Sequence, residues 1–464
     1  MNDGGTGAGT ARVAVVGAGP AGLYAVQALL ASGPAIRVDV FDRLPTPYGL
    51  VRYGVAPDNQ KIKSVTRVLR TAFDDERRVR FIGNVRFGVD LHRADLLEHY
   101  DAVVYATGAQ GERRLGIPGE DLPGSHGAKD FVDWYSGHPD AAERSFRLDT
   151  TSVAVVGAGN VALDVARMLV RTPEEIAATD VPDRVLGAFR ESRVTDAHLI
   201  ARRGVAQAKF TAEELRTING LPEVDIVVRP GEVSLTGEDE RLIASNRQLA
   251  ANVAMMREWS QRPSRGKPRR IHIRFLRSPV RILGGNRVEG VVLERNEPLA
   301  DGQVRGTGEC ETLEVGMIFR SVGYKALPLA GVAFDEARSV IPHREGRVLD
   351  EAGRIAEGEY VTGWAKRGPS GIIGTNKSDS AQTVSHLLAD LAARSSYKGR
   401  DPREITDRLR DRGVDCTDWA DWLRLDGHEI ELGRAQGRPR VKLPALRAML
   451  DAARLPDPNA CEGH

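Results

Sequence analysis

The pattern of apolar and polar residues near the N-terminus predicts a strand, a helix and a second strand in succession. Residues 12–16 (RVAVV) form a short run rich in β-branched side chains, which is typical of a buried parallel strand. Residues 23–32 (LYAVQALLAS) repeat apolar side chains at helical spacing, and residues 36–41 (IRVDVF) form the next apolar run. We therefore expect a βαβ unit of about thirty residues.

The same order of elements appears again further along the chain. Residues 152–156 (SVAVV) predict a strand, and residues 163–171 (LDVARMLVR) predict a helix. The return strand, at 196–200 (DAHLI), is delayed by a polar stretch over residues 172–193. Two βαβ units in one chain predict an α/β fold with two binding sites of the same general type.

Other segments give weaker signals. Short apolar runs that end in small residues predict strands at 101–108, 316–323 and 359–364. Residues 262–270 (RPSRGKPRR) predict a solvated basic loop. Beyond about residue 395 the pattern changes to helices and a tail.

Length and charge narrow the class of protein. A chain of 464 residues is too long for one ordinary core and predicts two domains, or one domain interrupted by another. Lys and Arg number 65 against 64 Asp and Glu, so a protein that coats nucleic acid is not expected. Residues 1–10 have the composition of a disordered tail. We see neither a signal peptide nor an apolar run long enough to span a membrane, and expect a cytoplasmic protein.

The cysteines limit the redox chemistry. Cys310, Cys416 and Cys461 lie far apart and form no CxxC pair. This spacing argues against a disulfide framework, against an iron–sulfur or zinc site built by this chain alone, and against a redox-active dithiol. We therefore predict no bound metal.

A glycine motif follows the first predicted strand. Gly17 suits a tight turn, Gly19 lets a pyrophosphate approach the backbone, and Gly22 lets helix and strand pack closely. Asp42 lies twenty residues after Gly22, at the end of the second strand, where a carboxylate can accept from both ribose hydroxyls and would repel a 2′-phosphate. This first motif therefore favours FAD or NAD over NADP.

A second glycine motif follows the strand at 152–156. It contains Gly157 and Gly159, and Ala162 takes the third glycine position, which the fingerprint tolerates. Arg202 and Arg203 stand after the return strand instead of an acid. Because guanidinium groups bind phosphate through charge-assisted hydrogen bonds, we expect NADP(H) here, while a simple surface arginine pair is the alternative.

Five segments resemble the adrenodoxin reductase-like ferredoxin–NADP reductases and their bacterial counterparts. They occur in the family's order, from Arg12 to about Leu391, and the C-terminal GRPRVKLPAL resembles the bacterial branch. The segments are 44–63 (LPTPYGLVRYGVAPDNQKIK), 159–167 (GNVALDVAR), 201–216 (ARRGVAQAKFTAEELR), 320–324 (RSVGY) and 363–377 (GWAKRGPSGIIGTNK).

The resemblance implies two Rossmann-like domains, one inserted into the other. An FAD-binding domain would comprise residues 11–108 and 325–464, with a C-terminal extension from about 395, and an NADP-binding domain would span 109–324. Family residues that contact the flavin match Ala21, Asp42, Leu50, Val85, Trp364, Gly371, Ile372 and Ile373. Those that contact the nicotinamide nucleotide match Ala158, Gly159, Asn160, Val161, Arg202, Arg203, Glu214 and Gly371.

Two of these positions also have a physical rationale. The indole of Trp364 can cover a flavin face or rim, and its N–H can donate, although simple core packing explains such a tryptophan equally well. Gly371 suits a helix N-terminus whose backbone N–H groups approach the flavin's oxygen-bearing edge.

Asn59 departs from the family pattern. Family members commonly carry a histidine here, near the nicotinamide side of the flavin, where it interacts with a carboxylate matched by Asp164 or Glu214. Asn59 can form hydrogen bonds but cannot titrate near neutrality. We therefore take Asn59, Asp164 and Glu214 as catalytic candidates and expect an altered pH dependence rather than a loss of activity.

The resemblance implies hydride transfer from NADPH to FAD, followed by single-electron transfer to a ferredoxin, an iron–sulfur carrier that serves haem monooxygenases or similar enzymes. The run containing Arg262, Arg265, Lys267, Arg269 and Arg270 is a candidate docking patch for an acidic ferredoxin.

Three alternatives stay open. A flavin-dependent paralogue could oxidise or reduce a small organic substrate without ferredoxin, and a non-catalytic nucleotide sensor would share the two sites. A relative of the small glutamate synthase chain is disfavoured, because no cysteine precedes Cys310.

Overall fold

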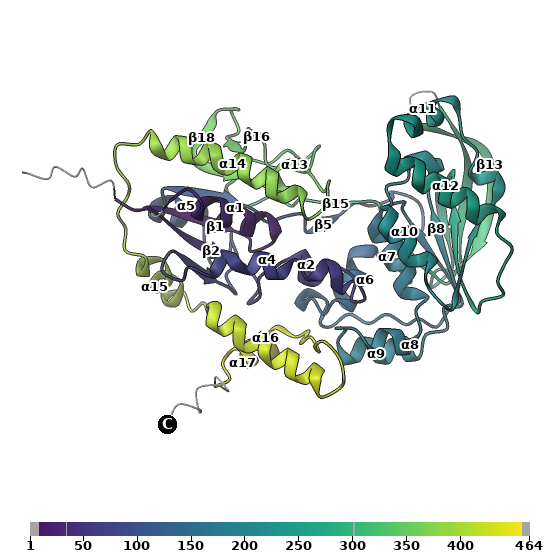
Figure 1. The fold of residues 1–464 in the computed structure, drawn as a ribbon, viewed down its shortest axis with the longest axis horizontal. Coiled ribbons are helices and arrows are strands. Elements are labelled where there is room, and N and C mark those ends of the chain that lie inside the picture. Colours follow the sequence, from purple (N-terminus) through teal and green to yellow (C-terminus); the bar gives the residue numbers. More distant parts are fainter. Residues whose placement is uncertain (1–8, 34, 300–301, 457–464) are drawn as a thin grey trace, which may run out of the picture.

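The computed structural model describes residues 9–33, 35–299 and 302–456, and Figure 1 shows two parts side by side, each built around a sheet whose central strands are parallel. Most of the predicted tail, and Cys461, lie outside these ranges. The two parts follow the two βαβ units of the sequence.

The first part contains a seven-stranded sheet from two distant stretches of chain. The strand order is β16-β17-β18-β4-β1-β2-β3, and β18, β4, β1, β2 and β3 run parallel. Their bounds are β1 Ala11–Val16, β2 Ile36–Phe41, β3 Val79–Ile82, β4 Ala102–Tyr105, β16 His343–Arg344, β17 Arg347–Leu349 and β18 Ile355–Val361. All of β1 is buried, since helices cover both faces of the sheet.

Helices α1 (Pro20–Leu30) and α14 (Thr375–Ala392) pack against each other on one face, and α5 (Arg93–His99) and α15 (Arg403–Asp411) contribute to the core on the other. Shorter helices follow β2 and β18, namely α2 Leu50–Tyr53, α3 Gln60–Lys63, α4 Thr66–Arg70 and α13 Trp364–Arg367, with a 3-10 turn at Thr71–Phe73.

The second part contains a six-stranded, all-parallel sheet in the order β6-β14-β7-β8-β10-β9. The strands are β6 Ser125–Gly127, β7 Ser152–Val156, β8 Asp196–Ile200, β9 Val224–Val228, β10 Arg269–Arg274 and β14 Met317–Arg320. The helices are α6 Ala128–Tyr135, α7 Asn160–Leu169, α8 Pro173–Ala177, α9 Asp183–Arg190, α10 Ala212–Asn219, α11 Gly237–Ser245 and α12 Arg247–Gln261, with 3-10 turns at Pro139–Ala141, Val205–Gln207 and Pro230–Glu232.

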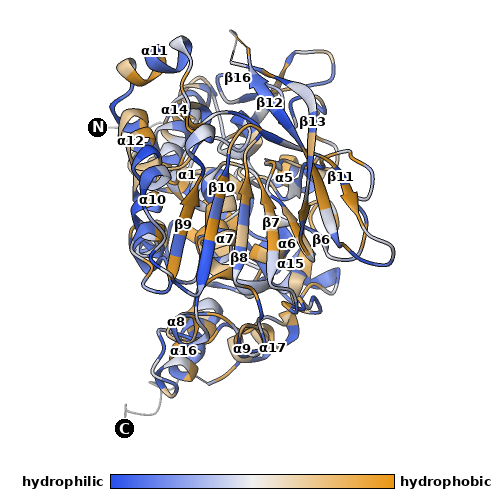
Figure 2. Ribbon diagram, turned by 90° about the vertical axis from the view of Figure 1, so that its right-hand side faces the viewer, coloured by the Kyte–Doolittle hydropathy of each residue, from blue (hydrophilic) through white to orange (hydrophobic). Residues whose placement is uncertain are grey.

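An antiparallel sheet of β11 (Arg277–Leu283), β12 (Gly290–Pro298) and β13 (Val304–Glu314) packs its apolar residues against Ala154, Val156 and Ile200 of the six-stranded sheet. Figure 2 shows these strands beside the row formed by β9, β10, β8 and β7. Helices α6, α7, α10 and α12 contribute to the core on the opposite face.

Two chain segments connect the parts. They pair as the short antiparallel strands β5 (Gly111–Glu112) and β15 (Tyr324–Lys325), which lie between the two sheets in Figure 1. Because both crossings are paired with each other, the parts meet through one narrow, hydrogen-bonded connection in addition to their side-chain contacts.

Several expectations from the sequence need correction. The basic loop predicted at 262–270 is wrong at its end, because Arg269 and Arg270 belong to β10. The polar stretch at 172–193 contains α8 and α9, which bury Ile176 and Phe189. The four strands of the two βαβ units are confirmed, within one residue at the start of β1. In the part of the chain that is described, no helix combines the length and apolar character needed to cross a membrane.

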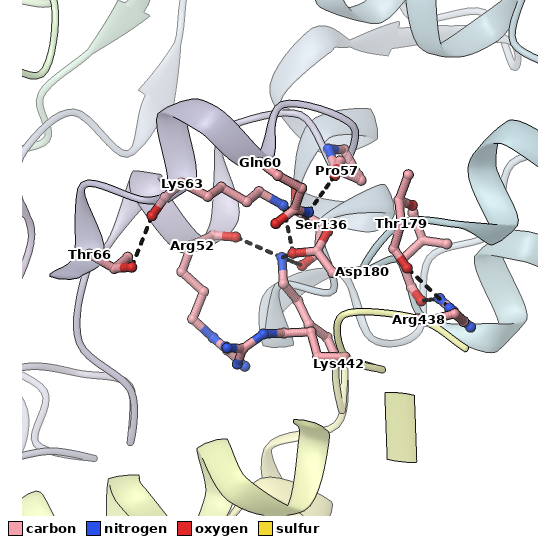
Figure 3. A network of polar contacts seen from close by, with 12 residues as sticks. Arg52, Pro57, Gln60, Lys63, Thr66, Ser136, Thr179, Asp180, Arg438 and Lys442 are labelled. Carbon is pink, nitrogen blue, oxygen red and sulfur yellow. Dashed lines mark hydrogen bonds and ion pairs between the residues drawn. The ribbon is translucent and has the colours of Figure 1, made fainter. Parts of the chain in front are cut away.

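The C-terminal segment contacts both parts of the molecule, and we call the contacts made by its residue Lys442 the clamp. Helices α16 (Trp419–Arg434) and α17 (Leu446–Ala453) pack together, and Trp419 stacks on Phe73 at 4.2 Å between ring centroids. Between them, Lys442 is buried and donates from Nζ to the carbonyl oxygens of Arg52, at 2.8 Å, and Ser136, at 3.0 Å. Figure 3 shows this clamp.

Asp180 completes the contact from the second part. Its carboxylate pairs with Lys63 Nζ at 2.6 Å and lies 3.4 Å from Lys442 Nζ. The two ammonium groups hold the pKa of Asp180 well below its usual range despite burial, which opposes them. Arg438 adds a hydrogen bond from Nε to the carbonyl oxygen of Thr179 at 3.0 Å. One buried cluster therefore joins the N-terminal stretch, the second part and the C-terminus.

Substituting Lys442→Met tests this clamp. The substitution leaves two buried carbonyl groups without their donor and leaves the Asp180 carboxylate with one cation fewer beside it. We therefore expect the free energy of unfolding to fall by about 3 kcal/mol in urea titrations. Lys61→Met is the matched control, because Lys61 pairs with Glu213 while 83% exposed and should change stability by less than about 1 kcal/mol. Equal effects of the two substitutions would contradict the clamp.

Candidate functional site

The first glycine motif forms a tight turn between β1 and α1. Gly17 has φ of +111°, and a Cβ there would lie 2.5 Å from the carbonyl oxygen of Ala106. A Cβ on Gly22 would collide with the Gly17 carbonyl oxygen. Gly19 caps α1 without a side-chain hydrogen bond, and the first turn carries no acid. The N–H groups and the positive end of the helix dipole are therefore available for an anion.

Asp42 lies at the end of β2 beside this turn. Its Oδ2 accepts from Ala18 N–H at 2.7 Å and its Oδ1 from Leu44 N–H at 3.0 Å. Burial raises the pKa of Asp42, although these hydrogen bonds oppose the shift. Val85 is buried and donates its N–H to the Asp42 carbonyl oxygen at 2.9 Å. The carboxylate is thus fixed, and each oxygen keeps a lone pair for another donor.

The other predicted flavin residues gather around the same helix N-terminus. Leu50 opens α2 directly after Gly49, which lies against Gly19. Ala21 packs so closely on Gly363 that a Cβ there would lie 2.5 Å from the Ala21 Cβ. Residues far apart in sequence therefore meet beside the first turn.

Trp364 and Gly371 differ from expectation in detail. The Trp364 indole N–H donates to the Ser370 carbonyl oxygen at 3.2 Å, and its ring lies 5.8 Å from that of Tyr324, on the β15 connection. The helix expected to begin at Gly371 begins at Thr375, because Gly371 has φ of +80°, outside helical geometry. Ile372 is a 68% exposed apolar side chain, whereas Ile373 packs on the core.

The second glycine motif repeats the turn between β7 and α7. A Cβ on Gly157 would collide with the Ser321 carbonyl oxygen, whereas a Cβ on Gly159 would meet nothing within 4 Å. Gly159 caps α7 without a side-chain hydrogen bond or an acid in the first turn. Ala162 is fully buried. The backbone at Gly159 therefore has open space beside it, and α7 begins without a side-chain cap.

Neighbouring residues fix the rest of this motif. The Ala158 carbonyl oxygen accepts from Lys209 N–H at 2.8 Å, and Asn160 Oδ1 accepts from Thr211 N–H at 2.9 Å. Val161 packs partly buried on the core of the second part. The segment before α10 is thereby held beside the turn.

Arg202 and Arg203 follow β8 and place two guanidinium groups next to each other in sequence. Their carbonyl oxygens accept from Asn296 Nδ2 at 2.7 Å and from Leu276 N–H at 3.1 Å, which fixes the backbone. Among the described residues neither side chain has an ion-pair partner, and Arg203 Nε is buried without an acceptor. An unpaired buried donor beside a second guanidinium suits a bound phosphate.

A buried network brings the three catalytic candidates together. Arg167, on α7, has a side chain with 0% exposure and pairs with Glu214 Oε2 at 2.7 Å, Asp164 Oδ1 at 2.7 Å and Asp58 Oδ2 at 2.9 Å. Asn59 Nδ2 donates to Glu214 Oε1 at 3.2 Å. Asp58 and Asn59 come from the first part, while Arg167, Asp164 and Glu214 come from the second.

The sequence reasoning missed Arg167 and Asp58. Arg167 stands three residues after Asp164 in an apolar helix, and an arginine among buried positions was the available signal for an internal ion pair. Burial is the largest cause that raises the pKa of Asp164, to about 7, and the nearby Glu214 and Asp58 carboxylates add to it while Arg167 opposes it. The surroundings of Asp164 therefore favour its neutral, protonated form more than those of an ordinary aspartate do.

The predicted docking run is largely neutralised. Arg262 pairs with Glu258 at 2.7 Å, Arg265 with Asp225 at 3.0 Å and Arg270 with Asp196 at 2.5 Å. Arg269 Nη1 donates to the Val170 carbonyl oxygen at 3.1 Å. The run therefore offers an acidic partner much less free positive charge than the sequence indicates.

Among the described residues, one group places potential metal ligands close together, with atoms of Asp196, His198 and His272 within 4.8 Å of one another. The two imidazoles are stacked, 4.3 Å apart and 13° from parallel, so their in-plane lone pairs do not converge. Arg270 also occupies both oxygens of Asp196. This geometry suits an ion-pair cluster rather than a metal centre.

Known proteins match this arrangement over nearly its whole length. Residues 11–208 match the family model described as pyridine nucleotide-disulphide oxidoreductase. NADPH-ferredoxin reductase FprA of Mycobacterium leprae is 41% identical over 95% of this chain and 97% of its own length. The mitochondrial NADPH:adrenodoxin oxidoreductase of Arabidopsis thaliana is 38% identical, with 95% of each chain covered.

A solved structure agrees. Mycobacterium tuberculosis FprA in complex with NADPH superposes with a TM-score of 0.91 at 40% identity, covering 96% of this chain and 99% of that one. Identity at this level over both chains, together with the shared fold, shows the family as well as the architecture. The chain therefore belongs to the family of NADPH–ferredoxin reductases that includes FprA and adrenodoxin oxidoreductase.

Proposed function

We propose that this chain is an NADPH–ferredoxin reductase that transfers a hydride from NADPH to FAD and then delivers single electrons to a ferredoxin. The observation that carries the proposal is the asymmetry of the two glycine turns. The first turn lies in the unit that carries the fixed carboxylate of Asp42. The second lies in the unit that carries Arg202 and Arg203, whose guanidinium groups have no ion-pair partner among the described residues. Family membership supplies the reaction type.

FAD fits the first turn. The uncapped N-terminus of α1 would hold the pyrophosphate, and Asp42 would accept from the ribose hydroxyls. Leu50, Val85, Trp364, Gly371, Ile372 and Ile373 would surround the remainder. The flavin supplies the ability to take two electrons as a hydride and release them singly, so the protein need only bind, orient and shield it.

NADPH fits the second turn. Gly159 leaves room over the backbone for the pyrophosphate, and the arginine pair would bind the 2′-phosphate. Asn59, Asp164 and Glu214 would lie on the nicotinamide side. Hydride transfer itself needs no protein acid or base, so these residues would set position and charge.

We further propose domain limits at the paired connections, with 11–108 and 325–464 binding FAD and 109–324 binding NADP(H). The strands of the two sheets divide in the same way, and β5 and β15 lie at the limits. We also propose a cytoplasmic location, from the sequence, and a haem monooxygenase as the final electron acceptor, from the family resemblance. Asn59 keeps a hydrogen bond to Glu214, at 3.2 Å.

Gly159→Ala tests the pyrophosphate approach. Gly159 has φ of −119° and free space around its Cα, so alanine should fold normally. The added methyl group would occupy the space of the bound pyrophosphate, and we expect the KM for NADPH to rise about tenfold or more while FAD content is unchanged. Gly187→Ala, in α9 and equally free of neighbours, is the control. An unchanged KM for NADPH would contradict this placement.

Replacing Arg202 and Arg203 by alanine tests the choice of nucleotide. Loss of charge-assisted hydrogen bonds to the 2′-phosphate should raise the KM for NADPH roughly 10- to 100-fold and leave that for NADH nearly unchanged. Steady-state ferricyanide reduction measures both values. Arg257→Ala, an exposed substitution on α12, should alter neither. Equal losses with NADPH and NADH would place the 2′-phosphate elsewhere.

A further inference from the structure

We propose that Asp164 and Glu214 form a carboxyl pair that shares one proton, held by Arg167 and Asn59, and that this pair is the titrating group beside the nicotinamide. The inference rests on the proposed function for the location of the nicotinamide. It concerns positioning and charge control by residues of the cluster around Arg167.

The hydrogen bonds around the pair leave room for one proton. Glu214 uses Oε2 to accept from Arg167 at 2.7 Å and Oε1 to accept from Asn59 at 3.2 Å. Asp164 Oδ1 accepts from Arg167 at 2.7 Å. The two carboxyl groups therefore accept from neighbouring nitrogens of one guanidinium, Glu214 from Nη1 and Asp164 from Nη2, and lie close together. Two like charges held this close on one guanidinium repel each other, which favours retention of one proton by the pair.

Among the groups that face the pair, the carboxylates favour retention of that proton and the guanidinium groups oppose it. Asp58 and Asn59 face it from the loop before α3, Arg167 from α7 and Arg171 from the turn after α7, while Tyr135 faces it from α6 and Tyr324 from β15. Arg171 is shared between Asp58, at 2.7 Å, and Glu175, at 3.3 Å. Three largely buried carboxyl groups therefore surround one fully buried guanidinium, and a like charge at close range disfavours ionisation of the last of them.

Asn59 cannot take over the titration. Its Nδ2 donates to Glu214, while its Oδ1 accepts from Ile62 N–H at 3.2 Å and caps α3. Both ends of the amide are used, so the side chain is oriented and stays neutral. The raised pKa of Asp164 agrees with titration of the carboxyl pair instead.

The location of the charge gives a specific consequence. The oxidised nicotinamide ring is cationic, whereas the reduced ring is neutral. Loss of the shared proton as the pH rises places one more negative charge near the ring, so NADP⁺ should bind more tightly above neutrality and a neutral-ring analogue should not. The 2′-phosphate also titrates, but it is common to both ligands and cancels in the ratio of their dissociation constants.

The experiment measures this ratio on the oxidised holoenzyme between about pH 5.5 and about pH 8.5, with NADP⁺ and the non-reactive analogue 1,4,5,6-tetrahydro-NADP. In the wild type we expect NADP⁺ to gain roughly five- to thirtyfold over the analogue across neutrality. Asp164→Asn should abolish the pH dependence of the ratio. Glu213→Gln is the matched control, because it removes an exposed carboxylate from the same helix as Glu214 and should leave the dependence intact.

Two further measurements complete the test. The infrared band of a protonated carboxyl group should disappear from the wild type as the pH rises through neutrality, a readout that needs neither nucleotide nor a foldable variant. Asn59→His should lower the midpoint, because an imidazolium beside Glu214 favours ionised carboxylates.

The outcomes separate this inference from the proposed function. A pH-dependent ratio that survives in Asp164→Asn, or the absence of the protonated carboxyl band in the wild type, would overturn the carboxyl pair while leaving an NADPH-dependent reductase intact. Failure of the wild type to bind NADP⁺ at any pH would instead overturn the proposed function itself.

Discussion

Buried ion pairs between the two parts of the molecule are the constraint on which the site depends. Within the described ranges, the β5–β15 connection is the one pair of strands that the parts share, so their relative placement rests on side chains. Asp58 and Lys63, both from the first part, pair with Arg167 and Asp180 of the second. A buried charge is strongly unfavourable without its partner, so a displacement that separates these pairs is resisted.

This constraint also determines which residues can serve the chemistry. Both nucleotides must reach the same region, since hydride transfer needs reacting atoms in near contact. The loop carrying Asn59 is pinned on one side by the ion pair of Asp58 and on the other by Lys63. Asn59 is therefore presented to Glu214 by neighbours whose partners lie in the other part. Lys442 also holds this stretch, because its Nζ donates to the Arg52 carbonyl oxygen.

What the sequence could predict follows from the range of the interactions. The glycine turns, Asp42 and the arginine pair lie within single βαβ units, where local geometry is set by nearby residues, and the structure places them at the expected strand ends. The pairing of Arg167 with Asp58 spans 109 positions, and that of Lys442 with the Arg52 carbonyl spans 390, so no local pattern announces them. The prediction that a helix begins at Gly371 is wrong, because a sequence motif does not reveal the positive φ of that residue.

The basic run at 262–270 shows the same limit of sequence-based prediction, but here the sequence overestimates a charge instead of missing a contact. Arg265 and Arg270 read as solvated charges because their partners, Asp225 and Asp196, are distant in sequence but adjacent in the sheet. A count of positive residues in a loop therefore overestimates the charge presented to a partner. At the carboxylates around Arg167, in contrast, folding creates an excess of one charge. Their number exceeds the available guanidinium charge, and this imbalance is visible only once the fold has assembled them. Electrostatic function in this chain is thus set by which charges remain uncompensated after folding, rather than by their abundance in the sequence.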